Sequence, residues 1–114
     1  MQSAARRIAE ADRFVRNGKW AHFEPLDLLG YDLSSSVLGI IGFGRIGSYL
    51  GKIANDNGMK VLYYNRSIPE ETYGAQRMDS LEELLENSDV VSLHCPYTPE
   101  TKNLITKKQL KLMK

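Results

Sequence analysis

The sequence of 114 residues has a single cysteine, Cys95, no long apolar run and almost no net charge. One cysteine cannot form an internal disulfide, which is typical of a reducing compartment. No run approaches the roughly 20 apolar residues that span a bilayer, and residues 1–13 are too polar for a signal peptide. A net charge of +1, from scattered basic and acidic residues, gives no electrostatic reason to bind nucleic acid. These absences predict a cytoplasmic domain without a nucleic-acid or membrane partner.

The composition that remains is that of an ordinary globular protein, with 42% apolar and 25% charged residues. The first region is expected to form one helix, with an apolar face made of Ala4, Ile8, Ala11 and Val15. Asn17-Gly18 is a typical helix stop. Residues 19–36 then read as a connector, in which Trp20 and Phe23 are expected to pack against a surface. We therefore expect a helix and connector over residues 1–36 and a second region over residues 37–114.

Short apolar runs alternate with helical patterns in the second region. They predict strands at Val37–Ile41, Lys60–Tyr64, Gln76–Met78 and Asp89–Leu93. Alternating strands and helices are typical of a parallel sheet with right-handed crossovers. The prediction is an α/β fold: a Rossmann-type parallel sheet with helices on both faces, truncated after about four strands and preceded by the N-terminal helix.

Three helices are expected among and after these strands. The first follows residue 41, ends at Asn57-Gly58, and has a face formed by Ile46, Leu50, Ile53 and Asn57. Ser80 and Glu83 form a capping box for a second helix, which runs through Glu86. Thr106 and Gln109 form another capping box, and the chain is expected to end at Lys114 inside that last helix.

Three glycines directly follow the first predicted strand. Gly42, Gly44 and Gly47 match the pattern G-x-G-x-x-G, in which the glycines permit a tight turn, close approach of a diphosphate, and close packing of the helix on the sheet. Backbone amides of Arg45 and Ile46 lie in the first helical turn, where the helix dipole favours an anion. Strand, loop and helix occur in the required order, so residues 37–114 are expected to form a partial dinucleotide-binding domain.

The end of the second predicted strand bears on which dinucleotide is bound. An acidic residue normally binds the ribose 2′-hydroxyl of NAD at this point, but this chain has Asn65, Arg66 and Ser67. Asn65 would not repel a 2′-phosphate, and Arg66 and Ser67 could bind it. Charge therefore favours NADP. NAD stays open, because Arg66 could be a solvated surface residue while Asn65 binds the ribose hydroxyl.

Together these residues resemble the D-isomer-specific 2-hydroxyacid dehydrogenases, in particular the glyoxylate/hydroxypyruvate reductase branch. The matching stretches are ARRIAEADRFVRNGKW, LGIIGFGRIG, GMKVLYYNRS, SLEELLENSDVVSLHCPYTPETKNLI and KKQLKLMK. One departure is Ser35, where such proteins usually have glycine. The resemblance implies an enzyme that moves a hydride between a nicotinamide and C2 of a small 2-hydroxy or 2-oxo acid. It also implies a homodimer, because dimers in this family form through this domain.

The resemblance also suggests what the segment does not contain. In the family, the Arg, Glu and His that act on the substrate lie downstream of the stretch that this chain's end resembles. No catalytic residue and no metal ligand is therefore predicted here, and the chain alone is expected to bind cofactor without turnover. His22 and His94 are interpreted as structural. The resemblance places Cys95 and Pro96 beside the adenosine half of the cofactor, with Thr101 as a further candidate or a helix cap.

Two other functions fit parts of the pattern. S-adenosylmethionine sites also use a glycine-rich loop, although Asn65-Arg66 replaces the acidic residue that they usually have. A non-enzymatic dimerisation or interaction module is the other alternative, because a strand at residues 89–93 without a further neighbour would be an exposed sheet edge.

Overall fold

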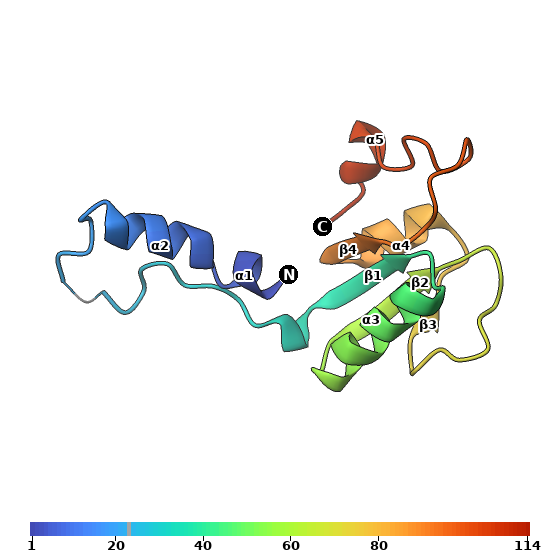
Figure 1. Cartoon of the computed structure of the whole chain (residues 1–114), viewed down its shortest axis with the longest axis horizontal. Coiled ribbons are helices and arrows are strands. Elements are labelled where there is room, and N and C mark those ends of the chain that lie inside the picture. Colours follow the sequence, from blue (N-terminus) through green and yellow to red (C-terminus); the bar gives the residue numbers. More distant parts are fainter. Residues whose placement is uncertain (23) are drawn as a thin grey trace. The chain divides into compact units, whose positions relative to one another are not determined.

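A computed structural model describes residues 1–22 and 24–114, which divide into two compact units, Met1–Leu33 and Ser34–Lys114. The expected packing of Phe23 lies outside the described residues. No helix in the described part of the chain is long and apolar enough to cross a membrane. Figure 1 shows the two units in chain order, coloured from blue to red.

The first unit contains two helices where the sequence predicted one. Helix α1 spans Gln2–Ala5 and helix α2 spans Ile8–Arg16. The continuous helix is wrong because Arg7 has a left-handed conformation, with φ of 53°, and the Ala5 carbonyl accepts a hydrogen bond from Tyr31 N–H (3.1 Å) in place of a helical one. A long-range contact thus overrides local propensity. The stop at Asn17-Gly18 is confirmed, with Gly18 at φ of 66°.

The second unit is built on a parallel sheet, and the Rossmann-type prediction is confirmed. After the short 3₁₀ turn η1 (Leu33–Ser35), its strands are β1 (Val37–Ile41), β2 (Lys60–Tyr64), β3 (Gln76–Arg77) and β4 (Val90–Leu93). Their order is β3-β2-β1-β4, with every pair parallel. Two bounds differ from the prediction, because Met78 and Asp89 lie just outside β3 and β4.

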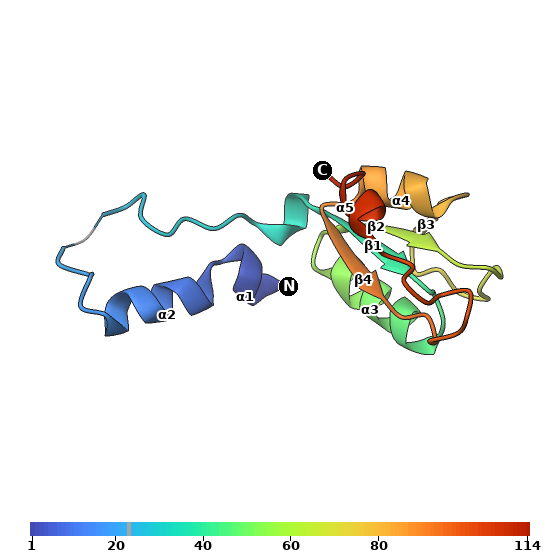
Figure 2. The same ribbon diagram turned by 90° about the horizontal axis from the view of Figure 1, so that it is seen from above.

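Helices α3 (Arg45–Asp56) and α4 (Leu81–Asn87) cover opposite faces of this sheet, as Figure 2 shows. On the α3 side, Ile40 of β1 lies next to Gly47 and Gly51. On the α4 side, a cluster of buried residues forms the larger part of the core: Ile41, Leu62, Met78, Leu81, Leu84 and Leu85. The sheet therefore buries both faces, which explains why β1 and β2 read as continuous apolar runs.

The face of α3 that contacts the sheet is not the one that carries Ile46 and Ile53. Gly47, Gly51 and Ala54 are buried, whereas Ile46 is 71% exposed and Ile53 is 43% exposed. The helix approaches the sheet so closely that only small residues fit. A methyl group on Gly51 would lie 3.0 Å from the Phe43 ring. The periodicity of the larger apolar residues therefore predicted the helix and its end at Asn57, but it does not mark the face that packs on the sheet.

Helix α4 begins with the predicted cap, in a modified form. The Ser80 hydroxyl accepts a hydrogen bond from Glu83 N–H (3.1 Å), while the Glu83 carboxylate accepts one from Asp79 N–H (3.0 Å) and not from that of Ser80. At the other end, Ser88 is fully buried and donates to the Leu84 carbonyl (2.6 Å). A side chain at Gly39 of β1 would collide with this Ser88 hydroxyl, so α4 also lies close to the sheet.

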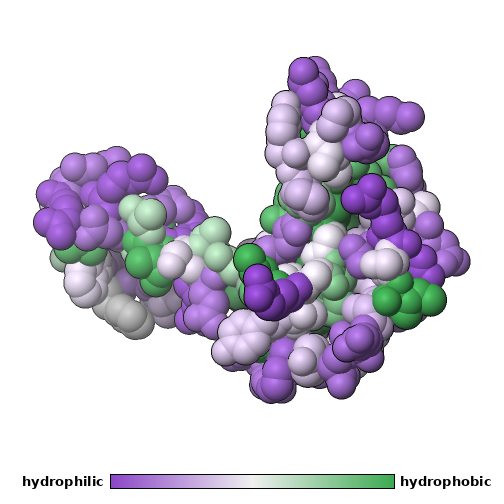
Figure 3. All heavy atoms as spheres, turned by 45° about the vertical axis from the view of Figure 1, so that its right-hand side comes forward, coloured by the Kyte–Doolittle hydropathy of each residue, from purple (hydrophilic) through white to green (hydrophobic). Residues whose placement is uncertain are grey.

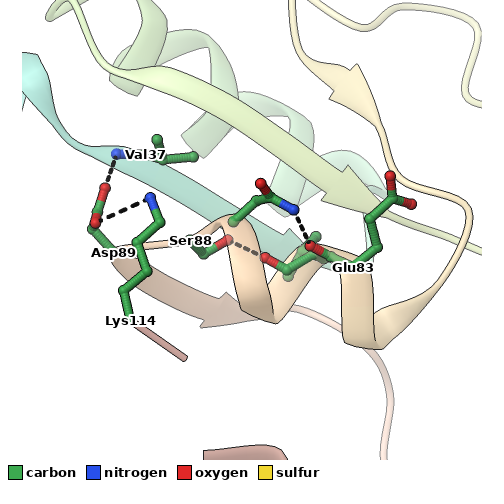
Figure 4. Close-up of polar contacts among 7 residues, drawn as sticks. Val37, Glu83, Ser88, Asp89 and Lys114 are labelled. Atoms are coloured by element: carbon green, nitrogen blue, oxygen red, sulfur yellow. Dashed lines mark hydrogen bonds and ion pairs between the residues drawn. The ribbon is translucent and has the colours of Figure 1, made fainter. Parts of the chain in front are cut away.

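Asp89 joins the start of β1 to the end of the chain. Its carboxylate accepts a hydrogen bond from Val37 N–H (2.8 Å) and pairs with the Lys114 ammonium (3.3 Å), as Figure 4 shows. The Val37 hydrogen bond, with a further contribution from Lys114, lowers the pKa of Asp89. This carboxylate therefore stays charged while it anchors the first strand.

The last helix is shorter than expected. Helix α5 spans Lys107–Leu110 and has the predicted capping box between Thr106 and Gln109. The prediction that the chain ends within a helix is wrong, because the helix stops at Leu110. Leu112 and Met113 then pack against the core cluster on the α4 side.

Candidate functional site

A pocket of about 330 Å³ lies at the carboxyl ends of β1, β2 and β4. In an open parallel sheet this edge, at the point where the strand order reverses, is where ligands bind. Most of the predicted binding residues line it, namely Gly42, Gly44, Asn65, Arg66, Cys95, Pro96 and Thr101. The remaining lining residues are Ile41, Tyr64, His94, Glu100 and Leu104. The other predicted residues, Arg45, Ile46, Gly47 and Ser67, are not part of the lining.

Gly42 and Gly47 make the turn from β1 into α3 compact. Gly42 has φ of 91°, and a methyl group on it would lie 2.7 Å from the Cys95 backbone nitrogen. A methyl group on Gly47 would lie 2.2 Å from the Gly42 carbonyl oxygen. A side chain fits at neither position, since the obstructing atoms belong to the backbone. These two glycines therefore set the close approach of loop, helix and β4.

Gly44 has different surroundings. It is the N-cap of α3, and apart from Gly44 itself and its two chain neighbours no heavy atom of the described residues would lie within 4 Å of a methyl group placed on it. No side chain in the described part of the chain caps this helix. The first amides of a helix have no partner within it, so those of Arg45 and Ile46 carry the positive end of the helix dipole next to the open side of Gly44. This arrangement fits a diphosphate group.

Asn65 fastens the glycine loop to the loop after β2. Its Oδ1 accepts a hydrogen bond from Phe43 N–H (3.2 Å), and its Nδ2 donates to the Ser67 carbonyl (2.9 Å) and hydroxyl (3.3 Å). Both the oxygen and the nitrogen of this side-chain amide are thus engaged within the protein. The sequence identified Asn65 as a ribose or phosphate neighbour but gave no sign of this bridging role.

Arg66 and Glu100 bring opposite charges to the same pocket. A hydrogen bond from the Thr98 side chain, one from its own backbone N–H, and the positive charge of Arg66 lower the pKa of the Glu100 carboxyl, in that order of size. Glu100 is therefore ionised at neutral pH. Sequence reasoning missed it, although it directly precedes Thr101 in the stretch YTPET.

The segment after β4 holds its shape by internal hydrogen bonds. The Thr101 hydroxyl donates to the Pro96 carbonyl (2.6 Å) and accepts from Thr98 N–H (2.8 Å). Thr101 N–H lies 3.3 Å from the Thr98 hydroxyl, a cap-like contact in a turn that is not a helix. The Thr101 side chain therefore shapes the pocket wall, with its hydroxyl engaged by the turn itself.

The two histidines lie in different units, and each contacts a side chain two residues away in the sequence. His94 lines the pocket, and its Nε2 lies 2.9 Å from the Ser92 hydroxyl. His22 belongs to the first unit and pairs with Glu24 (2.8 Å), with 71% of its side chain exposed. In the described part of the chain, no cluster of three or more His, Cys, Asp or Glu side chains could hold a metal ion.

The whole chain, residues 1–114, matches the family model described as the NAD binding domain of D-isomer specific 2-hydroxyacid dehydrogenases. The chain belongs to this family. The match agrees with the parallel sheet, the glycine loop and the pocket at its carboxyl edge, and it replaces the S-adenosylmethionine alternative.

Similar proteins agree with the family. A glyoxylate reductase of Thermococcus litoralis is 51% identical over 98% of this chain and 36% of its own length. A D-lactate dehydrogenase of Aquifex aeolicus, solved with NAD and lactic acid, has a TM-score of 0.89 and 35% identity over 99% of this chain and 34% of its own. An acyclic imino acid reductase, solved with NADPH and D-Arg, has a TM-score of 0.84 and 36% identity over 97% of this chain and 35% of its own.

This family member thus spans about a third of the length of the proteins that it matches. It is a nicotinamide dinucleotide-binding domain, and the residues at the sheet edge fit such a group. The start of α3 would hold the diphosphate, and the pocket at the carboxyl ends of β1, β2 and β4 would hold the adenosine half. When bound, the nicotinamide supplies the hydride chemistry.

Proposed function

We propose that this domain binds NADP in preference to NAD. The observation that carries the proposal is the joint position of Arg66 and the open start of α3 on one pocket. A guanidinium favours a 2′-phosphate, and no acidic residue follows β2 directly to bind a 2′-hydroxyl. The similar structures support a nicotinamide dinucleotide in general, since their bound cofactors include both NAD and NADPH.

Calorimetric titration with NADPH and NADH tests this preference. The chain should bind both, and NADPH more tightly. Arg66→Gln should reduce the affinity for NADPH by about tenfold, the loss of one charge-assisted interaction, and leave that for NADH nearly unchanged. The matched control is Arg77→Gln, which changes an exposed arginine of β3 outside the pocket. Equal losses for the two cofactors in Arg66→Gln would contradict the preference.

For the whole protein we propose reduction of a small 2-oxo acid, such as glyoxylate or hydroxypyruvate, at the expense of the nicotinamide cofactor. The glyoxylate reductase relative supports this substrate class. The 114-residue chain is expected to bind cofactor without turning over either acid. Steady consumption of NADPH by the purified chain in the presence of glyoxylate would contradict that expectation. A cytoplasmic location is part of the proposal, supported by the single thiol.

We also propose that the protein forms a homodimer. Support comes from large apolar side chains that reach the surface of the first unit, including Ile8 (55% exposed), Val15 (49%) and Trp20 (60%). On the face shown in Figure 3, green apolar patches interrupt the purple hydrophilic surface of that unit. Burying such patches favours association. Light scattering should give twice the chain mass at micromolar concentration, and a monomer mass at every concentration would refute the dimer.

A further inference from the structure

Glu100 has no part in the expectations drawn from the sequence, yet it lies in the pocket beside the predicted phosphate ligand. The pocket collects Arg66 from the loop after β2 and Glu100 from the turn after β4. Both residues are exposed, and within the part of the chain that the structure describes they form no direct ion pair. The guanidinium therefore remains accessible to a ligand while it experiences the field of a carboxylate.

The position of Glu100 is fixed by the turn that carries it. Thr98 and Thr101 close this turn through their side chains and through Thr101 N–H, which donates to the Thr98 carbonyl (3.1 Å). The Lys102 N–H donates to the same carbonyl (2.9 Å). Glu100 lies between these bonded residues, so its backbone cannot move away without breaking several hydrogen bonds. The negative charge is thus a built part of the pocket.

The charges of Arg66 and Glu100 have different effects on NADP and on NAD. NADP differs from NAD by a phosphate that carries between one and two negative charges at pH 7. Arg66 attracts this group, whereas a carboxylate in the same pocket repels it and also competes for the guanidinium. The ribose hydroxyl of NAD has no charge, so the same carboxylate has little effect on NAD.

We propose that Glu100 is a specificity-determining residue, whose carboxylate competes with the 2′-phosphate of NADP for Arg66 and so limits the preference for NADP over NAD. The proposal rests on the proposed function, because it assigns a role within the same cofactor site. The preference is then a balance between two side chains of opposite charge on two separate loops. Removing the Glu100 carboxylate therefore shifts the cofactor preference toward NADP.

The test is titration of the chain and of Glu100→Gln with NADPH, NADH, 2′,5′-ADP and 5′-AMP. At about 0.05 M salt, the substitution should raise the affinity for NADPH and 2′,5′-ADP about fivefold, the effect of one unit charge several ångströms away in a solvated pocket. Affinity for NADH and 5′-AMP should change less than twofold. At 1 M salt, where the screening length is about 3 Å, the gain should largely disappear.

Two variants complete the experiment. Glu86→Gln removes an exposed carboxylate of α4 outside the pocket and should leave all four affinities unchanged. In a chain that already carries Arg66→Gln, Glu100→Gln should raise the affinity for NADPH by at most half as much as it does in the unsubstituted chain. The reason is that the carboxylate competes for the Arg66 guanidinium, which this background lacks. Glu100 is exposed, so a thermal melt should show each variant folded.

The outcomes separate the two proposals. An unsubstituted chain that binds neither NADPH nor NADH refutes the proposed function. A chain that binds them, with a Glu100→Gln variant whose NADPH-to-NADH ratio is unchanged, refutes the role of Glu100 alone. A loss of NADH affinity in that variant also refutes it, because Glu100 would then be a ligand of the ribose.

Discussion

Gly42, Gly44 and Gly47 follow one another from the end of β1 into the first turn of α3, but a methyl group on each would meet different surroundings. On Gly47 the methyl group would lie 2.2 Å from the Gly42 carbonyl oxygen, whereas on Gly44 it would meet no described atom within 4 Å other than those of Gly44 and its two chain neighbours. Substitution of Gly47 is restricted by the protein itself. Gly44 is open toward the space assigned to the diphosphate. Stability and cofactor binding should therefore respond separately to substitutions in this loop.

Gly47→Ala should lower the free energy of unfolding by about 1–3 kcal/mol, because the backbone must shift to admit the methyl group. Gly44→Ala should change it by less than about 0.5 kcal/mol but reduce NADPH affinity by about tenfold, since the methyl group occupies the space of the ligand. Denaturant unfolding and calorimetry measure the two effects. Equal destabilisation by both variants would contradict the distinction.

The pKa of Asp89 gives a pH dependence with a defined sign. Its carboxylate is charged more readily in the folded state than in the unfolded state, because Val37 N–H and Lys114 stabilise the charge. Its contribution to stability is therefore complete above about pH 4 and is lost as pH falls through the lower folded pKa. Since 34% of the side chain is exposed, the contribution should be no more than about 1 kcal/mol.

Asp89→Asn should accordingly lower the free energy of unfolding at pH 7, and the difference from the unsubstituted chain should shrink below about pH 4. Chemical denaturation at several pH values measures this. Glu86→Gln, at an exposed position of α4, is the control and should show no such difference. A difference for Asp89→Asn that stays constant to pH 2 would contradict the assignment.

At the scale of elements, helix α3 shows why spacing alone can mislead. Ile46, Leu50 and Ile53 recur with helical spacing, yet the helix contacts the sheet through Gly47, Gly51 and Ala54. The close approach needed by a dinucleotide loop selects small residues for the buried face. Apolar periodicity therefore predicted where α3 lies and ends, but its orientation depends on packing distance, which the pattern does not contain.

The pair Ile53→Asp and Ala54→Asp tests this orientation. Ala54 is 3% exposed and Ile53 is 43% exposed, and both lie in the last turn, where the helix dipole disfavours either carboxylate equally. Ala54→Asp should cost several kcal/mol or prevent folding, because it buries an unpaired charge. Ile53→Asp should cost about 1 kcal/mol. Thermal unfolding followed by circular dichroism compares them, and the reverse order would disprove the packing described.

Some features of the other elements depend on nearby residues, and others depend on contacts between distant parts of the chain. Strand positions, the caps at Ser80 and Thr106, and the glycine loop follow from nearby residues, and the sequence predicted them. The break at Arg7 depends on the Ala5–Tyr31 hydrogen bond, and Glu100 enters the pocket only because the turn after β4 comes back to the sheet edge. Such contacts join distant parts of the chain, so local patterns could not reveal them.

At the scale of the whole molecule, the chain consists of two compact units, Met1–Leu33 and Ser34–Lys114. The second contains the sheet, both covering helices and every residue that lines the candidate pocket. It also contains the main cluster of buried side chains. The first contributes two short helices with exposed apolar residues. The binding function and the proposed association therefore belong to different stretches of sequence.

A shortened chain of residues 34–114 should thus unfold cooperatively and bind NADPH within about threefold of the full chain, while it loses the homodimer. Denaturant unfolding, calorimetry and light scattering measure the three properties. If the shortened chain remained dimeric, the apolar surface of the first unit would not be the interface. Failure to bind NADPH despite a cooperative transition would place part of the site in the first unit.

The bridge made by Asn65 has a consequence for engineering. A carboxylate at this position is the obvious way to convert the domain to NAD, but Asn65→Asp would remove the amide hydrogens that now reach Ser67. The substitution would then remove hydrogen bonds that hold the loop after β2, while it also changes the selectivity between NAD and NADP. Glu100 accepts hydrogen bonds only from the Thr98 side chain and its own backbone among the described residues, and it lies in a turn outside every strand, so it offers a point where cofactor choice can be adjusted while the sheet stays intact.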